Sequence, residues 1–185
     1  PTGPEITSDT GVLMDADSGI LLYNKGGDEQ RYPASITKIM TTLIALENSD
    51  LNDIVTFSDA AIDNTEGSGI ARDYGEQMTM EQCLYAVMLA SANECAYAVA
   101  EHVGGTIENF VAMMNEKAKE LGCQNTHFAN PHGLHDENHY TTAHDMALIG
   151  SAVYQFDKFR EVTQTLNYTI PPTNLVNESR TFQQN

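Results

Sequence analysis

A serine and a lysine stand one helical turn apart in the run Pro33-Ala34-Ser35-Ile36-Thr37-Lys38. A helix places residues three positions apart on one face, so these two side chains can meet. A serine hydroxyl becomes a good nucleophile when a nearby base takes its proton. A lysine can be that base when burial or a neighbouring cation keeps it partly neutral. Because an apolar run, residues 39–46, follows directly, the pair predicts covalent acyl transfer with Ser35 as nucleophile and Lys38 as base.

A second group, Ser91-Ala92-Asn93, lies further along the chain between two apolar helical runs. Taken alone, such a group is typical of a helix–helix corner with a capping serine. The order Ser-x-x-Lys, then Ser-x-Asn, is the order of the first two motifs in penicillin-binding proteins and class A β-lactamases. Together the two groups favour serine acyl transfer over two unrelated helix ends.

In these motifs and in the segments around them, the chain resembles the low-molecular-mass penicillin-binding proteins, the serine-type D-alanyl-D-alanine carboxypeptidases. The resemblance implies a β-lactamase/transpeptidase-like fold, with a central antiparallel sheet, a helical lobe and an active site in the cleft between them. The similarity covers nearly the whole chain and is carried by the segments Ala16–Asn24, Tyr32–Thr41, Leu89–Asn93, Phe110–Asn115, Phe128–Leu134 and Tyr140–Ala147.

The resemblance also implies the chemistry. Ser35 attacks the peptide bond between two terminal D-alanines of a peptidoglycan stem peptide, and Lys38 accepts its proton. We expect Ser91 to relay a proton to the leaving amine, and Asn93 to bind the substrate's amide and orient Lys38. We expect no cofactor and no metal. β-Lactam antibiotics would acylate the same serine.

The chain departs from the family in one respect, because it contains no Lys-Thr-Gly motif. None of its lysines is followed by Thr-Gly; they are Lys25, Lys38, Lys117, Lys119 and Lys158. We expect the chain to stop before that motif, as a truncated form, a proteolytic fragment or one part of a two-piece protein. The backbone N–H of Ser35 would supply one oxyanion donor and the missing strand the other. Residues 1–185 alone are therefore expected to turn over little or no substrate.

Composition excludes several classes of partner. The chain of 185 residues has a formal charge of −17, which disfavours binding to nucleic acid. The same charge disfavours simple adhesion to anionic lipid, and no run of 18 apolar residues is present. We expect an extracytoplasmic, secreted or cell-surface protein. Any membrane contact is expected through a segment absent from this chain.

The pattern of elements predicts a mixed α/β fold with a helical insertion, incomplete at the C-terminus. We expect one transpeptidase-like module over 1–185, with residues 1–58 and 156–185 in the α/β layer and residues 59–155 in the helical lobe. Strands are predicted at 11–15, 20–23, 54–57, 168–170 and 175–177, a loop at 63–75, and helices at 35–46, 79–90, 93–103, 106–121 and 142–154.

Three other functions remain open at this point. A serine β-lactamase needs a base that activates water, and no Glu-x-x-x-Asn pattern lies between residues 130 and 142. A non-catalytic cell-wall binding protein of the same fold is supported only by the missing third motif. A zinc-binding surface is suggested by five of the six histidines, which fall at His127, His132, His135, His139 and His144. The resemblance favours a structural loop for this last segment.

Overall fold

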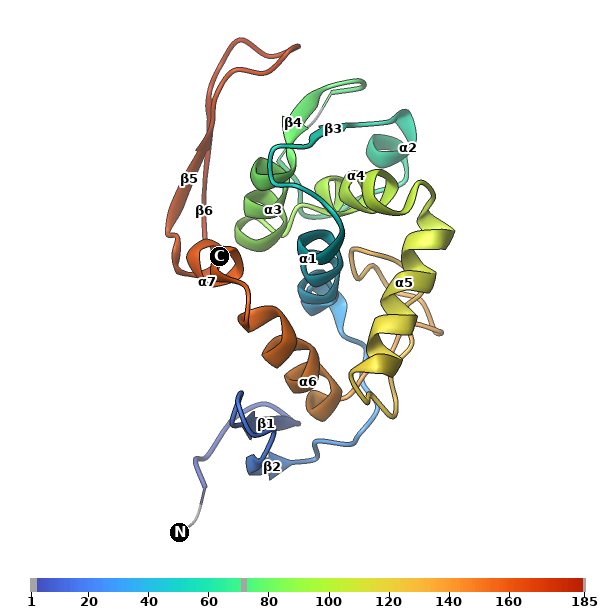
Figure 1. The fold of residues 1–185 in the computed structure, drawn as a ribbon, viewed down its shortest axis with the longest axis vertical. Helices are drawn as coiled ribbons and strands as arrows, with labels where there is room; N and C mark the ends of the chain where they lie inside the picture. Colours follow the sequence, from blue (N-terminus) through green and yellow to red (C-terminus); the bar gives the residue numbers. More distant parts are fainter. Residues whose placement is uncertain (1–2, 71–72, 185) are drawn as a thin grey trace.

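The computed structural model describes residues 3–70 and 73–184. Helix α1 (Thr37–Asn48) lies at the centre, and its first nine residues are almost all buried. Other helices surround it on several sides (Figure 1). Those that contact it are α3 (Met80–Leu89), α4 (Asn93–Gly104), α5 (Ile107–Glu120) and α6 (Ala143–Tyr154).

Three predicted helix starts are confirmed, each with a threonine cap. Thr79 and Gln82 form the capping box expected before α3. The hydroxyl of Thr106 accepts from the Asn109 N–H before α5, at 3.1 Å. The hydroxyl of Thr142 accepts from the Asp145 N–H before α6, at 3.0 Å. These caps satisfy N–H groups that have no partner inside the helix, and so fix where each helix begins.

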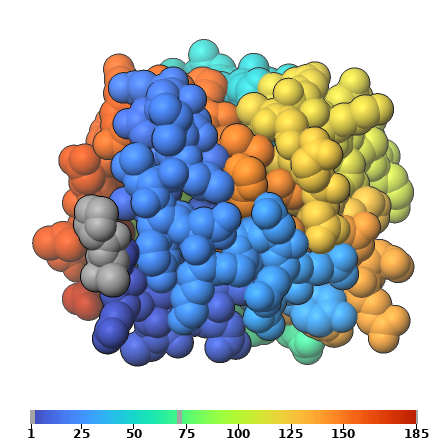
Figure 2. All heavy atoms as spheres, turned by 90° about the horizontal axis from the view of Figure 1, so that it is seen from below, coloured from blue at the N-terminus to red at the C-terminus, as the bar shows by residue number. Residues whose placement is uncertain are grey.

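The predicted N-terminal hairpin is also confirmed. Strand β1 (Gly11–Met14) pairs antiparallel with β2 (Leu21–Lys25). In the connecting turn the Asp15 carboxylate accepts from the Ser18 N–H at 2.7 Å, and Gly19 has a φ of +72°. Strand β1 packs on α6. Figure 2 shows these N-terminal residues spread across one face of the molecule, next to residues near the end of α5.

Three elements were not predicted. Helix α2 (Asp59–Asp63) is short and is capped by the Ser58 hydroxyl. Strand β4 (Gln77–Thr79) pairs with β3 (Ile54–Thr56). Helix α7 (Asp157–Gln164) buries Phe159 and Val162 in a segment for which we named only strands. Each is shorter than the windows in which sequence periodicity is informative.

The last strand was predicted in the wrong place. Strand β5 (Asn167–Ile170) agrees with the prediction, but its partner β6 is Arg180–Gln183. Residues 175–177 belong to the loop between them. That loop is anchored elsewhere, since the Thr173 hydroxyl donates to Glu76 at 2.7 Å and the side-chain oxygen of Asn174 accepts from the Gln77 N–H at 2.8 Å. The pairing of β6 with β5, and not local β propensity, sets its position.

The mixed helix and strand class is confirmed. In the described residues the strands form three separate two-stranded ladders, so the central sheet that the resemblance implied is not continuous here. The division into an α/β layer and a helical lobe stays a prediction. None of the helices in residues 3–70 and 73–184 combines the length and the apolar character needed to cross a bilayer.

Candidate active site

Ser35 lies on a tight turn that leads into α1. We expected an α-helix to begin at this residue. Instead a 3-10 turn (η1, Ala34–Ile36) precedes the helix, with Pro33 before it. Ala34 has a φ of +49°, a left-handed conformation that residues with a Cβ rarely adopt. The turn leaves Ser35 exposed while Lys38, on the first turn of α1, is buried.

Lys38 is the buried partner of that serine. Its side chain is 2% exposed. Its Nζ lies 3.4 Å from Ser35 Oγ and donates to the carbonyl oxygen of His132 at 2.7 Å. Burial disfavours the charged ammonium and lowers the pKa of Lys38 to about 8, against the opposing effect of the Glu94 carboxylate. A useful fraction of Lys38 is therefore neutral near neutral pH, as a general base requires.

A loop over residues 128–141 holds this pair from the opposite side. Thr41 donates to the carbonyl of Pro131 at 2.5 Å. The side-chain oxygen of Asn130 accepts from the Gly133 N–H at 2.7 Å. Gly133 lies so close to the Ala34 carbonyl that a Cβ would stand 1.9 Å from its oxygen. The loop thus fixes both the serine turn and the lysine.

The two buried histidines of this loop are structural. His139 accepts from the Ala129 N–H at Nδ1, 2.8 Å, so its Nε2 carries the proton and donates to the Thr37 hydroxyl at 2.7 Å. His132 accepts from the Leu134 N–H at Nδ1. Burial lowers the pKa of each ring to about 4, so both are neutral. The described residues hold no group of three or more ligating side chains suited to a metal ion.

Ser91 and Asn93 form the turn between α3 and α4. Ser91 has a φ of +53°, and its buried hydroxyl has no hydrogen-bond partner among the described residues. The backbone N–H of Asn93 donates to the Ser68 carbonyl at 2.9 Å, and its side-chain amide donates to the Glu66 carbonyl at 2.5 Å. This turn is therefore held by the loop 66–70, as the serine turn is held by the loop 128–141.

The structure brings Ser35 and Lys38 into direct contact. It links them to α4 indirectly, through Glu94, whose charge acts on Lys38, and through Tyr97, which stacks on His132 at a ring separation of 6.5 Å. Neither Glu94 nor the His132 carbonyl was predicted from the sequence. An acidic residue in the first turn of a helix is common, and a backbone carbonyl leaves no mark on residue type. Only the unusual burial of Glu94 would have drawn attention to it.

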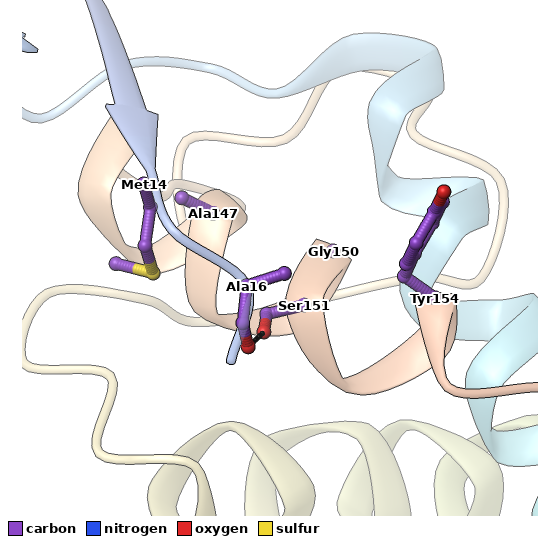
Figure 3. Close-up of a pocket in the computed structure, with 6 residues that line it drawn as sticks. All are labelled: Met14, Ala16, Ala147, Gly150, Ser151 and Tyr154. Carbon is purple, nitrogen blue, oxygen red and sulfur yellow. Dashed lines mark hydrogen bonds between the residues drawn. The ribbon is translucent and has the colours of Figure 1, made fainter. Parts of the chain in front are cut away.

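A hollow of about 170 Å³ is lined by residues 63–66 on one side and by Leu134 on the other. It connects the loop that holds Asn93 to the loop that holds Lys38. A second groove, of about 280 Å³, lies between β1 and α6 (Figure 3). Its lining includes Met14, Ala147 and Gly150, and the Ser151 hydroxyl donates to the Ala16 carbonyl within it at 2.8 Å. This second groove carries no titratable pair suited to catalysis.

Comparisons with known proteins agree with the geometry. The carboxypeptidase DacF of Bacillus subtilis is 42% identical over 83% of this chain and 41% of its own length. The crystal structure of the Streptomyces K15 DD-transpeptidase superposes with a TM-score of 0.92 and 31% identity, over the whole of this chain and 76% of that one. DacD of Francisella tularensis superposes with a TM-score of 0.85. The expected transpeptidase-like fold is therefore confirmed.

The match covers most of this chain but less than half of each of two relatives. The chain spans about two fifths of the length of the Bacillus subtilis and Haemophilus influenzae relatives that it matches. The family described as D-alanyl-D-alanine carboxypeptidase matches over residues 1–185. The contact between Ser35 and Lys38 lies within that match. This chain belongs to the D-alanyl-D-alanine carboxypeptidase family.

Proposed function

We propose that the protein is a serine DD-peptidase that removes the terminal D-alanine from peptidoglycan stem peptides through an acyl-enzyme on Ser35. The observation that carries the proposal is the contact of an exposed serine hydroxyl with a buried lysine amine at 3.4 Å. Family membership supplies the substrate class. Burial favours the neutral amine of Lys38, and this amine is the base.

The reaction divides into two halves. In the first, the Lys38 amine takes the proton of Ser35 Oγ as the oxygen attacks the carbonyl carbon of the terminal amide. The proton then passes to the amide nitrogen, through Ser91 in this proposal, the C–N bond breaks, and D-alanine leaves. In the second half, water attacks the serine ester, and the shortened peptide leaves with a free carboxylate. Lys38 takes the proton from the water and returns it to Ser35 Oγ.

The roles of the remaining groups follow from their positions. Asn93 lies at the N-terminal end of α4, and its side-chain amide donates to the carbonyl of Glu66, which lines the hollow at Leu134. We assign it the role of binding the amide of a peptide. The backbone N–H of Ser35 lies in the first turn of η1, where N–H groups have no partner within the helix. It would serve as one oxyanion donor. The other expected donor belongs to a motif that this sequence does not contain.

The setting of the reaction is part of the same proposal. A DD-peptidase acts on the cell wall, so we place the protein outside the cytoplasm, with a role in maintaining the wall and the cell shape. Its partners are stem peptides that end in D-alanyl-D-alanine and, as inhibitors, β-lactams. The strong negative charge fits neither nucleic acid nor anionic lipid as a partner.

The test is the site and the lifetime of a penicillin adduct, measured by mass spectrometry on the protein expressed from its complete coding sequence. We expect one benzylpenicilloyl group on the peptide that contains Ser35, lasting many minutes, and no adduct with Ser35→Ala. A brief adduct with rapid release of hydrolysed penicillin would favour a β-lactamase. Native protein that forms no adduct would favour a non-catalytic protein, and an adduct at another residue would overturn the assignment of Ser35.

A further inference from the structure

Glu94 is a buried acidic residue that the proposed reaction does not use. It follows Asn93 in the first turn of α4 and is 7% exposed. Glutamate is almost never buried to this extent unless its carboxylate is bound by other groups. Its position, one residue from a proposed substrate-binding side chain, calls for an explanation in terms of the site.

One part of the explanation is a contact with the loop 66–70. Glu94 Oε1 accepts from the Ile70 N–H at 2.7 Å. Gly69 lies directly against the other oxygen, since a Cβ there would stand 2.6 Å from Glu94 Oε2. The two bonds from Asn93 to the carbonyls of Glu66 and Ser68 fasten the other end of the same loop. Glu94 therefore completes the attachment of this loop to the start of α4.

The other part is the charge. Lys38 faces α4 on one side and the loop 128–141 on another, and the titratable groups found there are Glu94, Tyr97, His132 and His139. Both histidines are neutral, because burial lowers their pKa values. Helices α3, α5 and α6 meet α1 through apolar side chains such as Met88, Phe110 and Ile149. The Glu94 carboxylate is thus the source of negative charge that Lys38 experiences from α4.

We propose that Glu94 is a positioning residue of this site, whose carboxylate pins the loop 66–70 to the start of α4. Its negative charge also favours the protonated form of Lys38. The catalytic consequence rests on the proposed function. Lys38 must be neutral to take the proton from Ser35 and must then hold that proton long enough to pass it on. A group whose affinity for a proton is balanced near the working pH does both. Burial favours the neutral form of Lys38, and the Glu94 carboxylate opposes that effect.

The protonation of Lys38 can be measured without any activity. The chain has five lysines, so protein labelled with ¹³C at the lysine ε-carbon gives few NMR signals, and Lys38→Ala identifies the relevant one. We expect the titration midpoint of Lys38 to move to lower pH in Glu94→Gln, which keeps the size of the side chain and an oxygen for the Ile70 N–H. Glu101→Gln, two turns further along α4, is the matched control and should leave the midpoint unchanged. An unchanged midpoint in Glu94→Gln, or a shift to higher pH, would overturn the electrostatic half of the proposal.

A second variant separates the charge from the contact. Glu94→Asp keeps the charge but is too short to hold the Ile70 N–H at 2.7 Å. We expect its Lys38 midpoint to stay closer to the native value than in Glu94→Gln, while amide hydrogen exchange at Ile70 becomes faster. Native exchange at Ile70 in Glu94→Asp would overturn the positioning half. Should Glu94→Gln fail to fold, Glu94→Asn compared with Glu94→Asp still decides whether the charge acts on Lys38, because these two side chains differ in charge and not in size. Hydrogen exchange at Ile70 in Glu94→Asp still tests the contact with the loop.

The pH profile of penicillin acylation gives the catalytic readout. The acidic limb reports the neutral fraction of Lys38, so it should move to lower pH in Glu94→Gln. A purely structural role would lower the rate at every pH without moving the limb, and that result would contradict the inference. Native protein that forms no adduct at Ser35 would instead disprove the proposed function, while the lysine titration would still test Glu94 on its own.

Discussion

The turn that carries Ser35 and the turn that carries Ser91 share an unusual backbone but differ in the state of the serine. Among the described residues, Ala34 and Ser91 are the non-glycine positions with positive φ, at 49° and 53°. At the first turn the hydroxyl is exposed and lies against Lys38. At the second it is buried and has no partner in the described residues. The first hydroxyl therefore contacts a candidate base, whereas the second has no hydrogen-bond partner within the described part of the chain.

The two turns also differ in what holds them. The loop 128–141 holds the first through Gly133, His132 and His139. The loop 66–70 holds the second through Asn93 and Glu94. Backbone strain of this kind persists only where the surroundings enforce it, and it is common at functional sites. The comparison therefore predicts that a substitution in either loop will disturb the turn that this loop holds more than it disturbs the other turn.

The largest effect should come from removing the base. Lys38→Met keeps a long unbranched side chain in the buried site but cannot accept a proton. Loss of general base catalysis should lower the rate of penicillin acylation by roughly 10² to 10⁴. The rate is measured by stopped-flow or quench mass spectrometry, with thermal unfolding as a check of the fold. Lys117→Met, in a lysine of α5 paired with Glu47 at 2.8 Å, should leave the rate unchanged. A near-native rate in Lys38→Met would remove Lys38 from the mechanism.

The next effect tests the contact between the loop 128–141 and the serine turn. In Gly133→Ala the new Cβ would meet the Ala34 carbonyl at 1.9 Å, at a residue whose φ is +94°. The turn must shift, so we expect stability to fall by about 2 kcal/mol and acylation to slow by at least about tenfold, since a displacement of this size disturbs the attack geometry.

Gly122→Ala is the control for that variant. Gly122 has a similar φ of +84°, but a Cβ there would meet nothing within 4 Å. It should lose about 1 kcal/mol from backbone strain alone and acylate at the native rate. Equal loss of acylation in both variants would show that Gly133 acts through global stability and not through Ala34.

A further effect, on stability and not on the acylation rate, should appear in the pH dependence of unfolding. Burial lowers the pKa of His139 from 6.5 to about 4. The unfolded chain therefore binds a proton at this residue more readily than the folded chain does. The contribution of the neutral His139 ring to stability is complete above pH 6.5 and is lost as the pH falls through about 4. It amounts to about 3 kcal/mol. In His139→Asn, whose oxygen can still accept from the Ala129 N–H, the free energy of unfolding should fall less steeply over this range.

The sequence predicted the contact at the first turn better than the shape of that turn. The spacing of Ser35 and Lys38 was enough to predict their contact, because helical geometry depends only on spacing. The threonine caps of α3, α5 and α6 were found for the same reason, as a cap acts on the next turn of its own helix. The 3-10 start before α1 was missed, since it depends on Gly133, which lies far away in the sequence.

Long-range packing accounts for the other failures. Strand β6 lies at Arg180–Gln183 because β5 pairs with it there, although residues 175–177 have the more strand-like composition. The carbonyl of His132 holds Lys38 through the backbone, which any residue type supplies. Glu94 was overlooked because its burial is a property of the loop 66–70 and not of α4. In each case a segment distant in the sequence fixes the outcome, and local patterns carry no information about it.

The smallest effect, and the sharpest comparison of the two turns, comes from relieving their strain. A left-handed φ costs an L residue about 1 to 2 kcal/mol, part of which glycine gives back through its freedom in the unfolded chain. Ala34→Gly should therefore raise the free energy of unfolding by a few tenths to about 1 kcal/mol. Ser91→Gly should raise it more, because it also removes a buried hydroxyl without a partner in the described residues. Denaturant unfolding measures both, and Ser91→Ala, which keeps the strain but removes the hydroxyl, separates the effect of the strain from that of the hydroxyl.

A gain in stability at Ser91 combined with slower acylation would mean that the hydroxyl is kept for the reaction at the expense of the fold. Equal gains at the two positions would mean instead that the buried hydroxyl is satisfied in solution and that the two turns differ less than their geometry indicates.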